Sequence, residues 1–118
     1  MSRAKSKEQP DDRHLAAFHQ LNPNPVIGVN SAGSVTFLND GAKRTLESLG
    51  KKAPPEVFLP EDLGDMLAAL KRREPASFQC EVTVGERIFK EDIQVKLEHD
   101  AVFIHARDIT ELRRAEEK

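Results

Sequence analysis

Short apolar runs near the start of this chain and alternating apolar residues in its later part predict β-strands. Near the start, Val26–Asn30 and residues 34–38 are short apolar runs joined by Ser31-Ala32-Gly33. A glycine can take the positive φ of a tight turn, so we expect a hairpin here. Three later strands are predicted by Phe78, Cys80, Val82 and Val84, by Ile93, Val95 and Leu97, and by Val102, Ile104 and Ala106.

Helical spacing of apolar residues predicts two helices between these groups of strands. The first begins at Asn39 or Asp40, whose side chains accept hydrogen bonds from the amides of a first helical turn, and it ends at Gly50. The second opens with Pro60-Glu61-Asp62, a proline and acids that suit a helix start, and Pro75 prevents its continuation. Their apolar stripes are Ala42, Leu46 and Leu49, then Leu63, Met66, Leu67 and Leu70.

Two more helices are predicted at the ends of the chain. An entry helix begins at Asp11 or Asp12 and stops before the prolines of residues 22–25. An exit helix, or a linker, begins at Thr110 and is charged and helix-prone. The apolar face of the entry helix consists of Leu15, Phe18 and Leu21.

The order of elements predicts an α+β fold with a five-stranded antiparallel sheet and helices packed on one face. The 118 residues are enough for one domain with a single core. We therefore divide the chain into a flexible tail at 1–10, a domain at 11–109, and the start of a C-terminal helix or linker at 110–118.

Composition narrows the classes of protein. The chain is 38% hydrophobic and 32% charged, and no apolar run approaches the roughly 20 residues of a membrane span. The net charge of −2 and the absence of a basic stripe argue against nucleic acid as a direct partner. The lone Cys80 cannot form an internal disulfide, and the polar start is unlike a signal peptide. We expect a cytoplasmic location, with protein or small-molecule partners.

Five local motifs, in this order, resemble PAS sensor domains. They are Val-Ile-Gly-Val-Asn at 26–30, Gly-Ser-Val-Thr at 33–36, Asn39, Leu-Pro-Glu-Asp at 59–62 and Asp-Ile-Thr-Glu at 108–111. The resemblance covers about 15–118, and the order of predicted elements is that of the PAS fold. In many relatives a proline follows the asparagine, whereas Asp40-Gly41 follows it here. The stretch between the helices is also short, which favours a smaller pocket.

The resemblance implies a signal-input module of a bacterial sensor kinase or a related multidomain signalling protein. PAS domains of this kind often pair as homodimers, and their final helix drives a downstream effector. Here Ile109 and Leu112 fall near a coiled-coil seam, although a solvated terminal helix fits the same short segment. An alternative within the resemblance is a transcription factor, in which the exit helix leads to a DNA-binding region.

Neither haem nor flavin suits this sequence. The helical run 61–73 contains no histidine that could serve as an axial haem ligand, and His105 is out of phase with Ile104, so we expect it at a surface or a dimer contact. His14, His19 and His99 are expected to be solvated. Cys80 lies on a predicted strand, where it reads as a small core residue and not as a flavin photosensor thiol. The chain also lacks Trp and Tyr.

No catalytic constellation is evident, so we do not expect an enzyme. The acids Glu61, Asp62 and Asp65 stand where helix electrostatics already favours them. No nucleophile with a histidine base, no phosphate-binding glycine loop and no histidine pair at metal spacing occurs in the sequence. Any kinase or cyclase activity would belong to an effector beyond Lys118.

Two functions of different classes therefore stay open. One is a sensor for a small non-covalent ligand, apolar or weakly polar. The other is a ligand-free dimerisation and relay module whose core is filled by the same side chains. The candidate pocket residues are Val29, Phe37, Leu46, Phe58, Leu67, Phe78, Ile93, Val95 and Ile104.

Overall fold

The computed structural model describes residues 22–50 and 53–117. In chain order the elements are β1 (Val26–Asn30), β2 (Val35–Leu38), α2 (Asp40–Leu49), η1 (Pro55–Phe58), α3 (Leu63–Lys71), β3 (Ala76–Val84), β4 (Arg87–Lys96), η2 (Leu97–His99), β5 (Ala101–Asp108) and α4 (Thr110–Glu116). The predicted tail and entry helix lie outside the described residues.

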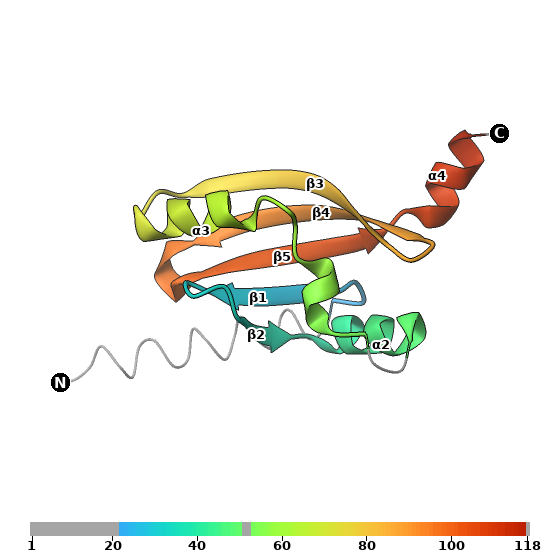
Figure 1. The fold of residues 1–118 in the computed structure, drawn as a ribbon, viewed down its shortest axis with the longest axis horizontal. Helices are drawn as coiled ribbons and strands as arrows, with labels where there is room; N and C mark the ends of the chain where they lie inside the picture. Colours follow the sequence, from blue (N-terminus) through green and yellow to red (C-terminus); the bar gives the residue numbers. More distant parts are fainter. Residues whose placement is uncertain (1–21, 51–52, 118) are drawn as a thin grey trace.

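One antiparallel sheet organises the domain, with strand order β2-β1-β5-β4-β3. β1 and β5 are neighbours, so the hairpin at the start of the described chain meets the last strand at the centre of the sheet. The helical segments α3 and η1 cross one face of it, while α4 leaves the end of β5 and projects away from the sheet (Figure 1). The predicted α+β fold, with five antiparallel strands and helices on one face, is confirmed.

Side chains from the sheet and the helical segments form one main core between the two layers. Ile27 and Val29 of β1 enter it, together with Phe58 of η1 and Met66 of α3. A second, smaller cluster lies on the opposite face of the sheet and consists of Val26, Ala101 and Phe103, with Phe37 packed against it. Both faces of the sheet therefore carry apolar contacts.

A β-bulge places Phe37 in the second cluster. The register of β1 with β2 shifts between Gly28 and Val29, so that Val29 pairs with Val35 while Gly28 pairs with Phe37. Val35 then packs against the main core, and the ring of Phe37 meets Phe103 edge-on with centroids 6.4 Å apart. A β-carbon on Gly28 would lie 3.0 Å from both aromatic side chains, so the glycine makes room for this contact.

The hairpin, its turn and the first helix follow the prediction. Gly33 has a φ of 88°, and Asn39 accepts a hydrogen bond from the amide of Ala42 at the start of α2. Two boundaries differ. α3 begins at Leu63 and not at Pro60, because residues 60–62 form a turn in which the amide of Leu63 donates to the carbonyl of Pro60.

The second difference lies at the end of β4. Leu97 was expected on the strand, but it begins the short helix η2, although its side chain still packs against the main core. Asp100 closes this turn with a left-handed φ of 51°, a conformation that aspartate tolerates better than most residues.

Asn39 fastens the start of α2 to the chain that enters β1. Its Oδ1 accepts from the amides of Val26 and Ala42 at 2.9 and 2.8 Å, while its Nδ2 donates to the carbonyls of Asn22 and Asn24 at 3.1 and 2.9 Å. This side chain is fully buried, so its own polar atoms depend on these backbone groups for their hydrogen bonds.

Candidate functional site

A carboxyl group lies in the main core on β4. Alternation along this strand turns Phe89, Glu91 and Ile93 toward the helices, whereas Asp92 and Gln94 point to the other face and are exposed. Glu91 has 0% exposure, the same as Ile93 beside it. Charged side chains are rarely this buried without a partner, so Glu91 is the most unusual residue of the core.

Only one oxygen of Glu91 has a hydrogen-bond partner among the described residues. Cys80 lies directly across from Glu91 in the pairing of β3 with β4, and its Sγ donates to Glu91 Oε1 at 3.7 Å. Glu91 Oε2 is buried and makes no hydrogen bond there. No ion pair within residues 22–50 and 53–117 includes this carboxyl.

Burial sets the protonation of both groups. It raises the pKa of Glu91 to about 8, and the hydrogen bond from Cys80 offsets only part of this rise. Burial together with the nearby charge of Glu91 raises the pKa of the Cys80 thiol to about 11. At neutral pH the site is therefore a neutral carboxylic acid beside a protonated thiol, and a thiol in that state is a poor nucleophile.

Eight of the nine candidate pocket residues lie in the main core or against it. Val29, Leu46, Phe58, Ile93, Val95 and Ile104 are buried there, and Leu67 and Phe78 pack against it while partly exposed. Phe37 lies on the other face of the sheet, for the reason given above. Phe58 and Phe89 meet edge-on with ring centroids 5.2 Å apart, which joins η1 to the strand that carries Glu91.

Glu91 was not among the residues that the sequence pattern singled out. The signal was present, because the alternation through Ile93 and Val95 reaches Glu91 when it is continued two residues back along the strand. A glutamate between Lys90 and Asp92 reads as part of a solvated charge cluster.

A network of hydrogen bonds joins the exit helix to β4. The buried Thr110 accepts from the amide of Ile88 at 2.8 Å and donates to Asp108 Oδ1 at 2.6 Å, and the amide of Ile109 donates to the carbonyl of Ile88 at 2.8 Å. Arg87 Nε donates to Asp108 Oδ2 at 2.8 Å. Residues 87–88 of β4 thus bind residues 108–110, and we call these two segments together the exit joint.

The carboxylate of Asp108 is ionised in this joint. Partial burial opposes its charge, but hydrogen bonds from Thr110 and Arg87 outweigh that effect and lower the pKa of Asp108. Farther along α4, Arg113 Nη1 donates to Glu81 Oε1 of β3 at 3.0 Å. Both strands of the β3–β4 hairpin therefore contact the exit segment.

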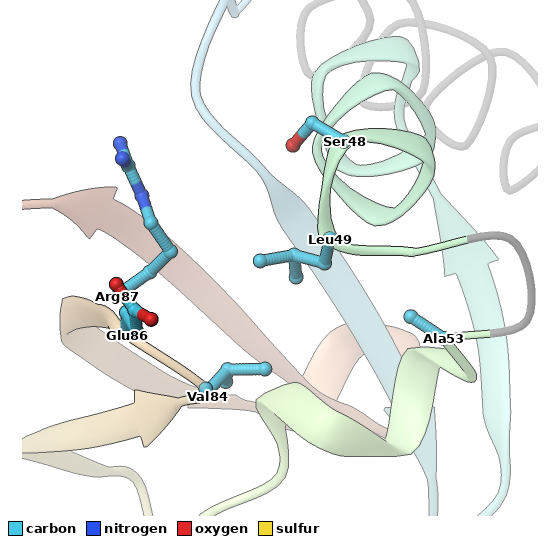
Figure 2. Close-up of a pocket in the computed structure, with 7 residues that line it drawn as sticks. Ser48, Leu49, Ala53, Val84, Glu86 and Arg87 are labelled. Atoms are coloured by element: carbon cyan, nitrogen blue, oxygen red, sulfur yellow. The ribbon is translucent and has the colours of Figure 1, made fainter.

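A cavity of about 440 Å³ lies between the end of α2 and the β3–β4 turn. Leu49, Ala53 and Val84 surround it, and Arg87 and Glu86 stand on its hairpin side (Figure 2). Because Arg87 also binds Asp108, this cavity adjoins the exit joint.

The histidine that we expected at a surface lies on the far side of the sheet. His105 lines a cavity of about 260 Å³ with Lys90, Asp92 and Arg107, and it is partly buried. Burial lowers the pKa of His105, so it is mostly neutral at pH 7. It does not face Glu91, which points to the opposite side of the sheet.

No three His, Cys, Asp or Glu side chains of residues 22–50 and 53–117 gather closely enough to hold a metal ion. In the same part of the chain, none of the helices combines the length and the apolar content that a transmembrane segment requires.

Among solved structures, one that is similar to this chain is a PAS domain. The PAS domain of BvgS from Bordetella pertussis resembles this chain at 20% sequence identity, with 92% of this chain and 95% of that chain covered and a TM-score of 0.44. No family model and no curated protein matches the sequence.

Proposed function

We propose that this chain is a PAS-type signal-sensing and relay module of a cytoplasmic signal transduction protein. In this proposal the core around Glu91 receives the signal, and the exit helix passes the resulting conformational change to a C-terminal effector. The single observation that carries the proposal is the buried Glu91 Oε2, which lacks a partner among the described residues. A group in that condition responds strongly to any change in its surroundings.

The relay rests on the short path from Glu91 to the exit joint. Glu91 pairs with Ala106 across β4 and β5, and Phe89 pairs with Asp108 two residues farther along the same strands. Two strand residues span about 7 Å. A shift of β4 that accommodates a change at Glu91 therefore acts directly on Ile88, whose amide and carbonyl hold Thr110 and Ile109.

An NMR titration tests this relay. We expect the backbone amide shifts of Thr110–Glu116 to follow a curve with a midpoint near pH 8 in the wild-type protein, because ionisation of the Glu91 carboxyl perturbs β4. In Glu91→Gln that curve should disappear. The exposed Glu98→Gln serves as the matched control and should leave it unchanged. Identical curves in the wild type and in Glu91→Gln would remove the basis for the relay.

We also propose that the module pairs as a homodimer through its exit helix. Leu112 of α4 is 55% exposed, whereas the neighbouring Ile109 is buried in its own domain, so Leu112 offers an apolar contact to a second copy. Light scattering should give a mass above 13.2 kDa that falls to 13.2 kDa in Leu112→Glu. A wild-type protein of 13.2 kDa at high concentration would refute the pairing.

Catalysis has no place in this proposal. The Cys80 thiol is protonated and donates a hydrogen bond to Glu91, and it is the only titratable group of the described residues that is hydrogen-bonded to Glu91. We assign any kinase or cyclase activity to an effector domain, and we assign to this chain the reception and transmission of the signal.

A further inference from the structure

The neutral Glu91 carboxyl carries one hydrogen that lacks an acceptor in the described part of the chain. A protonated carboxyl has one O–H donor, and Oε1 is already the acceptor of the Cys80 thiol. The proton therefore belongs on Oε2, which has no hydrogen-bond partner among the described residues. A buried donor without an acceptor destabilises the folded protein, and an acceptor placed within hydrogen-bond distance of it would recover that loss.

The side chains around this donor favour an apolar molecule. On the helix-facing side of β4, Glu91 is flanked by Phe89 and Ile93, both buried. On the neighbouring strands, its cross-strand partners are Cys80 and Ala106. Both partners are small, so the carboxyl projects beyond the side chains on either side of it. Cys80 is partly exposed on the edge strand β3, so this side of the site lies near the surface of the domain.

We propose that Glu91 Oε2 donates a hydrogen bond to the carbonyl oxygen of a small, uncharged, mainly apolar ligand held between the sheet and the helical layer. This inference rests on the proposed sensing function and names the ligand class of the same site. A cationic ligand would instead require the ionised carboxylate in an apolar core, and an anionic ligand would meet no cation in ion-pair contact with Glu91 among the described residues.

Three probes of matched size distinguish these chemistries. Acetophenone carries a carbonyl, 1-phenylethylamine carries an ammonium group at neutral pH, and ethylbenzene carries neither. At pH 6.5 we expect acetophenone to shift the amides of Cys80, Glu91 and Ala106 saturably. The other two probes should bind at least tenfold more weakly.

Two substitutions at Glu91 sharpen the test. Glutamine keeps an acceptor for the thiol and presents an N–H donor, so Glu91→Gln should retain acetophenone affinity within about threefold. Leucine has no donor, so Glu91→Leu should lose at least tenfold. If Glu91→Leu does not fold, Ala106→Val offers a second variant, because it fills the space beside the carboxyl and should weaken acetophenone by a similar factor.

The opposite pattern would overturn the ligand class. Tightest binding by the amine, with loss in Glu91→Gln, would indicate a site for a cation. Equal acetophenone affinity in the wild type, in Glu91→Leu and in Ala106→Val would place the ligand elsewhere. Failure of all three probes to bind would refute the site. The relay is measured without any probe, so each of these failures is distinguishable from a failure of the proposed function.

Discussion

At pH 7, replacing Glu91 with glutamine is expected to raise the free energy of unfolding by about 3 kcal/mol more than the same substitution does at pH 4.5. The pKa of this carboxyl is about 8 in the folded protein and 4.5 in its ordinary state. Between these values the unfolded chain releases a proton that the folded chain keeps. Wild-type stability therefore falls as pH rises from 4.5 to 8, and the neutral glutamine is free of this loss.

Urea unfolding at pH 5, 7 and 8.5 measures the effect. The gain from Glu91→Gln should grow with pH and level off above pH 8 at about 5 kcal/mol. Glu98→Gln, which changes an exposed glutamate, should stay within about 0.5 kcal/mol of the wild type at each pH. Parallel stability curves for the wild type and Glu91→Gln would mean that Glu91 is already ionised in the folded protein.

Replacing Asn39 with alanine is expected to lower the free energy of unfolding by about 3–5 kcal/mol. The substitution removes the four hydrogen bonds described above, and it leaves the buried amide of Val26 and the carbonyls of Asn22 and Asn24 without this partner. The amide of Val26 is buried, so water cannot replace its lost partner without opening the structure where the chain enters β1.

Two comparison variants test whether the lost hydrogen bonds cause the destabilisation of Asn39→Ala. Asn39→Asp keeps acceptors for the amides of Val26 and Ala42 but sets a carboxylate against two carbonyl oxygens, so it should also cost several kcal/mol. Asn30→Ala removes two exposed turn hydrogen bonds and should cost about 1 kcal/mol. Chemical denaturation at pH 7 measures all three, and a cost for Asn39→Ala no greater than that for Asn30→Ala would contradict the role of Asn39.

Local rules predicted much of the fold. The β1–β2 turn needs only a glycine at one position, and the inward face of β5 follows from alternation that no neighbour disturbs. Phe37 escaped prediction because the β-bulge depends on how two strands pair. The start of α3 escaped it because Pro60 was accommodated in a preceding turn.

The candidate site was harder to predict because its defining contacts are distant in sequence. Cys80 was assigned to the core face of its strand, but its hydrogen bond to Glu91 requires the register of β3 with β4. Arg113 and Glu81 are 32 residues apart, so the sequence offers no sign of their ion pair. The alternation along β4 points Glu91 inward, but burial of a glutamate runs against the usual preference of its charge for water, so composition outweighed the pattern.

Titration of the Glu91 side chain itself tests most directly the claim that a neutral carboxylic acid occupies the core. The carboxyl carbon shift, followed by NMR in protein labelled with carbon-13, should change with a midpoint near pH 8. Glu91→Gln identifies the signal by its absence. A midpoint near the ordinary value of 4.5 would contradict the account, because Glu91 would then be ionised at neutral pH.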